Sequence, residues 1–457
     1  MPAGNTSTEC EATLYLHWCG GDGLPEFSQS CLYSLWIYLH VVERVYLVHE
    51  NDLVDEIPVM ATPRLPYPVP TRPAPCPSGP PSRAPNLMQV LRPQLPLAEE
   101  LLPYLAEIDQ RRWYSNCGPL VTRLEEQLSR HLGFSNQGVI TTANATLGLT
   151  VALMARRVPP GSICLVPSWT FAATPHAARA AGLTPWFIDV DRRTWALNPD
   201  HATEILKRMP RPVSALIVVS PFGAPINVKA WEEFEDRTGV LVVVDAAAAF
   251  DTTCRSHLPF VVSLHATKIL GAGEGGFIAS TDSQFLERVR ACCNFGFQGS
   301  RHAMLAALNA KMSEYHAAVA LASLASWPQT RQRHIRIMEW YRRGVARLER
   351  VSLQPKYGHG WVSGTTSVLL PPRTQERVSQ NLLQSGIETR LWWGTGCHTQ
   401  PAFLDCPRGA LPVTEELGGR VLGLPHSPDM RKQDVDAVVA SLSEALNSRT
   451  SVRRQIA

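Results

Sequence analysis

The sequence predicts an α/β protein with a mostly parallel sheet in a large domain, followed by a smaller α+β domain. Strand-length apolar runs alternate with helix-length segments from Gly138 to Val244, and this alternation builds a parallel sheet covered on both faces. The runs are apolar almost throughout, as expected for strands buried on two sides. After about residue 330 the regular alternation gives way to mixed short strands and helices. We therefore expect a large domain over residues 86–330 and a small domain over 331–457.

Composition excludes several classes of protein. A chain of 457 residues exceeds one ordinary domain, and its apolar fraction of 45% is typical of soluble globular proteins. The net charge of +3 is too small to indicate a nucleic-acid partner, and no apolar run is long enough to cross a membrane. The eleven cysteines contain no CxxC pair, which favours reduced thiols over a disulfide framework or a zinc site. We therefore expect a cytoplasmic protein with no metal ion and no nucleic-acid or membrane partner.

The first 85 residues carry no pattern that connects them with the rest of the chain. Their start lacks the basic and apolar regions of a secretion signal. From Thr62 to Pro85, ten prolines fall in 24 residues, which enforces extended backbone and prevents a packed core. We expect residues 1–85 to be a disordered leader and linker. Two alternatives stay open: an interaction module with its own partner, and translation that begins downstream near Asn86.

The elements of the globular part follow from hydrophobic periodicity. Leu97 to Gln110 and a segment from Leu120 to Gly133 carry apolar residues at helical spacing. Strands are predicted where the short apolar runs fall, at 138–141, 163–166, 185–188, 216–219 and 240–244. Further helices are predicted at 285–293, 315–324, 331–348, 374–384 and 432–446, and a short strand at 364–370.

The stretch Phe260–Ser280, FVVSLHATKILGAGEGGFIAS, predicts a strand, a glycine turn and a second strand. Lys268 lies just past the first apolar run. A lysine between buried strands has little room for a full hydration shell, and desolvation favours its neutral, nucleophilic amine. Such an amine can form a Schiff base. The alternative is a solvated lysine in a glycine-rich turn.

Asp245 ends the apolar run Val240–Val244, and a buried acid needs a cation or hydrogen bonds beside it. The alternative is a helix N-cap for the residues that follow. Together Asp245 and Lys268 suit pyridoxal phosphate, which needs a lysine for its aldehyde and an acid for its pyridine nitrogen.

Two further blocks suit the same cofactor. In Thr141–Thr146 a strand runs into a helix, whose first amides attract phosphate; a plain Thr/Asn N-cap is a compatible interpretation. Pro167–Phe171 offers aromatic side chains just after a strand, either for the flat face of the ring or for the core.

Several of these blocks, in this order, resemble the DegT/DnrJ/EryC1/StrS family of sugar aminotransferases, from about Leu87 to Leu446. The resemblance implies the type I fold of pyridoxal-phosphate enzymes with a seven-stranded sheet. It also implies glutamate as amino donor, a nucleotide-linked keto sugar as substrate, and a homodimer. The block SLHATKILGAGEGG implies that Lys268 forms the Schiff base and that the Ser263 hydroxyl touches the phosphate. The block VVVDAAAAF implies that Asp245 pairs with the pyridine nitrogen.

The remaining blocks imply further contacts with the cofactor and the substrate. PSWTFAAT implies a ring contact, NAKMSE a contact with the phosphate site of a neighbouring subunit, and RRWYSNCGP and ETRLWWGTGCHTQPAF two substrate loops. The residues implied are Phe171 with Trp169 as second choice for the ring, Asn309 or Lys311 for the neighbouring subunit, and Asn116 and His398 as weak substrate candidates. An alternative for the segment around His398 is that it packs the small domain.

The sequence departs from the family pattern at two places. Three residues after the acid the family usually has Gln or His, which contacts the ring oxygen of the cofactor; here it is Ala248. The phosphate loop, usually Ser/Asn-Gly-Thr, is here Thr142-Ala143-Asn144, in which backbone amides persist and Asn144 can still donate. Losing the first contact costs about 1 kcal/mol in a typical case. Ala248 supports an alternative function, a cofactor-binding pseudoenzyme or regulator on the same fold.

Overall fold

The computed structural model describes residues 12–18, 42–49, 52–56, 87–134 and 137–448, in two units, Met1–Ser82 and Arg83–Ala457. In the first unit, β1 (Ala12–Trp18) runs parallel to β2 (Val42–His49), which pairs antiparallel with β3 (Asp52–Glu56). The sequence analysis assigned no element there. The proline-rich segment Thr62–Pro85 lies outside the described residues, so the expectation of a disordered linker stays a prediction.

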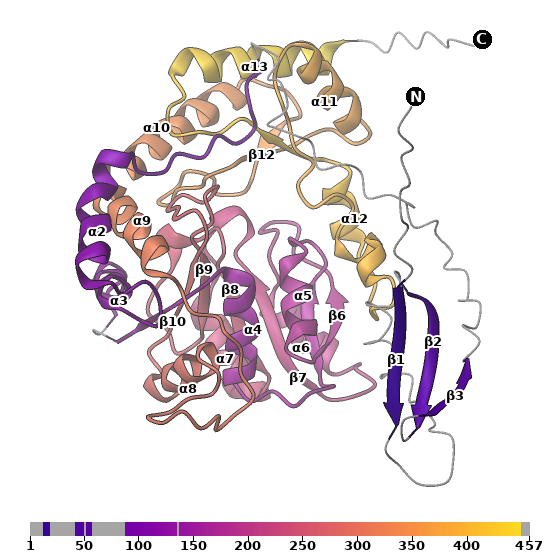
Figure 1. Ribbon diagram of the computed structural model, residues 1–457. Coiled ribbons are helices and arrows are strands. Elements are labelled where there is room, and N and C mark those ends of the chain that lie inside the picture. Colours follow the sequence, from indigo (N-terminus) through magenta and orange to yellow (C-terminus); the bar gives the residue numbers. More distant parts are fainter. Residues whose placement is uncertain (1–11, 19–41, 50–51, 57–86, 135–136, 449–457) are drawn as a thin grey trace, which may run out of the picture. The chain divides into compact units, whose positions relative to one another are not determined.

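A seven-stranded sheet forms the centre of the second unit (Figure 1). Its order is β4-β10-β9-β8-β7-β5-β6; β10 is antiparallel to both neighbours, and the other pairs are parallel. The strands are β4 (Val139–Thr142), β5 (Ile163–Pro167), β6 (Thr184–Ile188), β7 (Val213–Val219), β8 (Leu241–Asp245), β9 (Phe260–Ser263) and β10 (Gly276–Ala279). The prediction of a mostly parallel seven-stranded sheet is confirmed.

Both faces of this sheet are buried, as the uninterrupted apolar runs predicted. Along β8, Val242 and Val244 belong to one core and Val243 to the other, because successive side chains of a strand point to opposite faces. The helices of the large domain are α2 (Ala98–Arg111), α3 (Pro119–His131), α4 (Ala145–Ala155), α5 (Ala173–Ala180), α6 (Pro199–Leu206), α7 (Val228–Thr238), α8 (Ser283–Cys293) and α9 (Glu314–Ala325).

The segment predicted to form the small domain, and called the small domain below, contains a three-stranded antiparallel sheet with helices (Figure 1). Its elements are α10 (Trp327–Val345), β11 (Ser352–Leu353), β12 (Thr366–Leu369), α11 (Gln375–Gln384), α12 (Pro412–Gly418), β13 (Val421–Leu424) and α13 (Lys432–Asn447). The α+β character expected after residue 330 is therefore present. Residues 83–457 form one unit, so a boundary near residue 330 stays a prediction. None of the helices described in the structure has the length and apolar character needed to span a bilayer.

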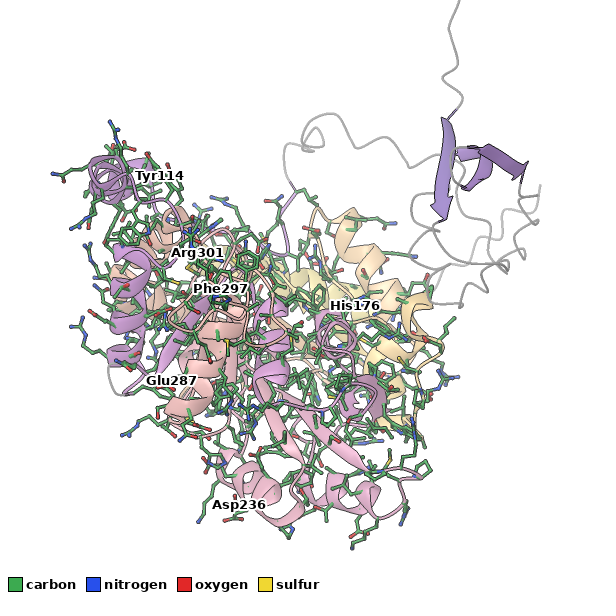
Figure 2. The ribbon with its side chains drawn as sticks, turned by 60° about the horizontal axis from the view of Figure 1, so that its bottom comes forward. Tyr114, His176, Asp236, Glu287, Phe297 and Arg301 are labelled. Carbon is green, nitrogen blue, oxygen red and sulfur yellow. The ribbon has the colours of Figure 1, made fainter. Side chains whose placement is uncertain are left out.

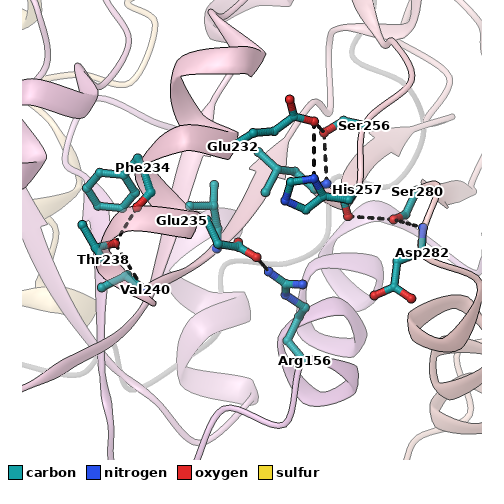
Figure 3. A network of polar contacts seen from close by, with 12 residues as sticks. Arg156, Glu232, Phe234, Glu235, Thr238, Val240, Ser256, His257, Ser280 and Asp282 are labelled. Carbon is teal, nitrogen blue, oxygen red and sulfur yellow. Dashed lines mark hydrogen bonds and ion pairs between the residues drawn. The ribbon is translucent and has the colours of Figure 1, made fainter.

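A group of polar contacts fixes α7 at the amino end of β8 (Figure 3). Glu235 of α7 accepts hydrogen bonds from the guanidinium of Arg156 and from the backbone N–H of Val242. Glu232, one helical turn earlier, accepts from Ser256 at 2.6 Å. These contacts lie at the end of β8 opposite Asp245, so the carboxyl end of the sheet is left for ligands.

Candidate active site

Four neighbouring strands, β4, β10, β9 and β8, bring the predicted cofactor residues to one end of the sheet. Gly276 of β10 pairs with Thr142 of β4 on one side and with Ser263 of β9 on the other. Asp245 at the end of β8 pairs with Val261 of β9. The phosphate loop after β4, the lysine turn after β9 and the acid of β8 therefore lie at the same place in the fold.

Asp245 is a buried carboxylate with few partners. It is 5% exposed, and it accepts hydrogen bonds from the Thr174 hydroxyl (2.7 Å) and from the N–H of Ala247 (3.1 Å). Burial raises the pKa of the Asp245 carboxyl, while these two hydrogen bonds and the charge of Lys268 act in the opposite direction. The N-cap alternative is not observed, because Ala249 precedes the short helix that follows.

Lys268 lies in the turn between β9 and β10 and is half-buried. Burial lowers the pKa of its amine, and nearby Asp245 partly offsets this effect. Among the described residues, no side chain or carbonyl accepts a hydrogen bond from its amine. An amine whose pKa is lowered by burial, close to a buried acid, agrees with the prediction from the lysine stretch.

The start of α4 offers free backbone N–H groups. Asn144 is its N-cap, and its side chain accepts from Leu147 N–H at 2.9 Å. The N–H of Ala143 donates to the carbonyl of Ala310 at 2.7 Å, so among the described residues the free donors that follow Asn144 are the N–H groups of Ala145 and Thr146. A Cβ built at Gly276 would lie 2.8 Å from the backbone N of Ala145, which makes glycine the residue that leaves room beside these donors.

The two aromatic candidates differ in environment. Phe171 is 66% exposed at the beginning of the α5 segment, whereas Trp169 is 1% exposed. Trp169 packs edge-on against Trp393, with ring centroids 5.2 Å apart, and Trp393 stacks on Phe222 at 4.5 Å. Phe171 therefore has a free ring face, and Trp169 is part of the core. Ser263, the predicted phosphate contact, accepts from the N–H of His265 at 3.2 Å.

The segment that carries Asn309 and Lys311 begins beside the phosphate loop of the same chain, through the bond between Ala143 and Ala310. The Lys311 amine donates to Asn309 at 2.7 Å and lies 4.4 Å from the ring centre of Phe295. Whether these side chains reach a neighbouring subunit stays a prediction.

The predicted N-terminal substrate loop is held by a residue that the sequence analysis missed. Glu314 is 1% exposed, and its carboxylate accepts from the N–H groups of Leu120 (2.8 Å) and Val121 (3.0 Å) at the start of α3. Its own N–H donates to the carbonyl of Tyr114 at 3.0 Å. Glu314 therefore fixes both sides of the loop in which Asn116 lies exposed, with a φ of 62°.

His398 is buried beside the residues that follow β5. It is 4% exposed, and its Nδ1 lies 2.7 Å from the Ser168 hydroxyl. Burial lowers the pKa of its imidazole, and Arg408 nearby adds to the effect. This side chain ties the C-terminal loop to the residues that follow β5 rather than to the predicted small domain, and its role toward the substrate stays a prediction.

The comparisons with known proteins agree with this geometry. The DegT/DnrJ/EryC1/StrS aminotransferase family matches residues 96–443. The chain belongs to this family. Two solved structures are each 32% identical to the chain. A putative PLP-dependent aminotransferase from Bacillus cereus ATCC 10987 has a TM-score of 0.74 and covers 78% of this chain and 99% of its own. DesI, solved in the presence of its TDP-sugar product, has a TM-score of 0.72 and covers 79% and 94%.

One relative found by sequence comparison has a name that refers to signalling and not to an enzyme. The erythromycin biosynthesis sensory transduction protein EryC1 of Saccharopolyspora erythraea is 28% identical over 367 residues, which are 77% of this chain and 98% of the relative. Membership of the DegT/DnrJ/EryC1/StrS family makes the protein an aminotransferase that depends on pyridoxal phosphate, so the predictions of enzyme class and cofactor are confirmed.

The residues of the site fit this cofactor. The buried Asp245 has acceptor capacity left for a protonated pyridine nitrogen. The free N–H groups at the start of α4 suit a phosphate, and the space beside Gly276 lets it approach. Thr174, which holds Asp245, was missed by the sequence analysis; its only signal was its place three residues after Phe171.

Proposed function

We propose that the protein transfers the amino group of glutamate to a keto carbon of a nucleotide-linked deoxysugar. The proposal rests on one observation: the half-buried Lys268 lies close to the buried carboxylate of Asp245, near the backbone N–H groups at the start of α4 that have no partner among the described residues. The sugar class is supported by family membership and by the TDP-sugar product in whose presence DesI was solved. Amino-sugar formation is thus the reaction to test first.

In this reaction Lys268 and Asp245 have separate roles. Bound pyridoxal phosphate supplies an electron sink for a carbanion at the reacting carbon. Lys268, whose pKa burial lowers, would take the proton from the α-carbon of glutamate and, in the second half of the reaction, would return a proton to the sugar carbon. Asp245 would accept a hydrogen bond from the pyridine nitrogen of the bound cofactor and would stabilise its positive charge. Thr174 keeps the carboxylate in place.

Lys268→Ala tests the covalent role of the lysine. Protein loaded with pyridoxal phosphate should lose the visible absorbance band of the lysine-bound cofactor. Lys229→Ala, at a lysine side chain that is 84% exposed on α7, should leave the band unchanged. An unchanged band in the Lys268 variant would exclude the proposal. A panel of nucleotide keto sugars with glutamate then identifies the substrate.

We also propose a homodimer in the cytoplasm. Large apolar side chains are about half exposed or more in the N-terminal loop and in the segment 294–315, from which Figure 2 labels Tyr114, Phe297 and Arg301. The two segments are in contact, because Tyr114 stacks on Tyr315. The exposed side chains are Trp113, Tyr114, Phe295, Met304 and Tyr315. Apolar patches of this kind mark protein interfaces. The described cysteines are free thiols, as in a reducing compartment. Light scattering should give twice the chain mass; a monomer at every concentration would exclude the dimer.

A cofactor-binding regulator is the second candidate. It is supported by Ala248, which offers no side-chain contact to the ring oxygen, and by the words "sensory transduction" in the name of EryC1. Glutamate alone distinguishes the two. An aminotransferase converts bound pyridoxal phosphate to the pyridoxamine form when glutamate is added, and a regulator does not.

A further inference from the structure

Four buried polar side chains of the small domain form one continuous chain of hydrogen bonds. The Tyr357 hydroxyl lies 2.6 Å from that of Thr366, which lies 2.9 Å from Nδ1 of His426. Nε2 of His426 lies 2.9 Å from Nδ1 of His334. The two rings are 5.1 Å apart at their centres and 21° from parallel, so they meet edge to edge. All four side chains are at most 3% exposed.

Both imidazoles of this chain are neutral near pH 7. Burial lowers the pKa of His334 to about 4. Burial, together with His334, lowers the pKa of His426 well below its ordinary value. Each ring therefore carries a single N–H, and the chain has only two possible directions of donation.

The hydroxyl groups select one of these directions. If Tyr357 donates to Thr366 and Thr366 to His426, then His426 donates from Nε2 to His334, and every hydroxyl hydrogen has an acceptor. In the opposite direction the hydrogen of either Tyr357 or Thr366 has no acceptor among the described residues. A buried donor without an acceptor is costly. The first direction is therefore favoured, and it leaves the proton of His334 on Nε2.

His334 and the lysine turn line the same small cavity. Nε2 of His334 is buried and has no hydrogen-bond partner among the described residues. The cavity has a volume of about 50 Å³, and its lining includes His334, Gly364 and residues 266–269. A Cβ at Gly364 would lie 3.9 Å from the carbonyl oxygen of Thr267, and none of the described donors binds that oxygen. A cavity of this volume is large enough for one water molecule.

We propose that His334 is a positioning residue for Lys268. Through one water in this cavity its Nε2–H donates to the carbonyl oxygen of Thr267 and fixes the backbone from which the Lys268 side chain extends. The hydrogen-bonded chain to Tyr357 keeps the proton on this nitrogen. The inference rests on the proposed role of Lys268 in holding the cofactor.

Two substitutions separate the two hydrogen bonds of His334. In His334→Asn the side-chain oxygen replaces Nδ1 and keeps the bond to His426, but the donor in the cavity is lost. In His334→Gln the amide nitrogen replaces Nε2 and keeps the cavity donor, but the bond to His426 is lost. Tyr341→Phe, which removes a buried hydrogen bond of 2.6 Å to the carbonyl of Pro425, is the control for lost packing.

The measurements are the rate at which cofactor-free protein captures pyridoxal phosphate, followed by its absorbance band, and the unfolding midpoint of the cofactor-free protein. We expect capture to slow roughly fivefold in His334→Asn and to stay near wild type in His334→Gln and Tyr341→Phe. If His334 has a purely structural role, capture should be slower in His334→Gln than in His334→Asn, because the Gln variant loses the direct hydrogen bond to His426. That result, or equal capture rates in the two variants, would overturn the inference.

A second measurement does not need the cofactor. In cofactor-free protein with ¹⁵N-labelled histidine, Nε2 should be the protonated nitrogen of His334. An unprotonated Nε2 would overturn the inference, independently of any result on cofactor binding. If wild-type protein captures no pyridoxal phosphate, the proposed function fails, and the state of this nitrogen still decides the inference.

Discussion

Acid should destabilise the protein through His334. The pKa of its imidazole is about 4 in the folded chain and 6.5 in an ordinary environment, so the unfolded chain binds a proton that the folded chain excludes. Stability from this group is complete above pH 6.5 and is lost as the pH falls toward 4. Between these two pKa values, the free energy of unfolding falls by about 1.4 kcal/mol for each pH unit of acidification. The full loss is therefore about 3 kcal/mol, of which about 2 kcal/mol falls between pH 7 and pH 5.

The assay compares variants at two pH values. Urea unfolding of wild-type protein and of His334→Asn is measured at pH 7 and pH 5, at one protein concentration. The stability difference between them should change by about 2 kcal/mol in favour of the variant at pH 5, because the variant lacks the group that must be protonated. His302→Asn, at an exposed histidine, should follow the wild type. An equal stability difference between wild type and His334→Asn at pH 7 and at pH 5 would refute the reasoning.

Three further changes test the site itself. Thr174→Val removes the hydroxyl that holds Asp245, so cofactor retention in dialysis should fall several-fold, while Thr174→Ser should retain it. Glu314→Ala leaves two N–H groups of α3 without acceptors and should lower the free energy of unfolding by roughly 2–3 kcal/mol in urea; an unchanged value would show that water replaces the carboxylate. Gly276→Ala puts a Cβ 2.8 Å from the backbone N of Ala145 and should weaken cofactor binding in a fluorescence titration, whereas Gly419→Ala, whose nearest neighbour would be 3.8 Å away, should not.

The parts of the fold that local pattern determines were predictable. Apolar runs marked the strands, and the places of Asp245 and Lys268 at the ends of two such runs put both side chains at the carboxyl edge of a parallel sheet. The observed helix and strand bounds differ from the predicted ones by a few residues. The predicted fold class needed no information about contacts between distant residues.

Residues whose role depends on distant partners were not predictable. Glu314 caps a helix at Leu120, which lies 194 positions earlier in the chain, and no periodicity connects the two. Ser168 and His398 meet only because the C-terminal loop returns to the residues after β5. Trp169 and Phe171 were ranked by family resemblance alone, because only packing separates a core ring from an exposed one.

Strand β10 has a consequence for how the enzyme can diverge. Because this one strand is hydrogen-bonded to both β4 and β9, it sets the spacing between the helix start that receives a phosphate and the turn that carries the amine. A one-residue insertion in β10 would displace both halves of the cofactor seat relative to each other. Changes of substrate are therefore expected to accumulate in the exposed loops, and this strand should keep its length.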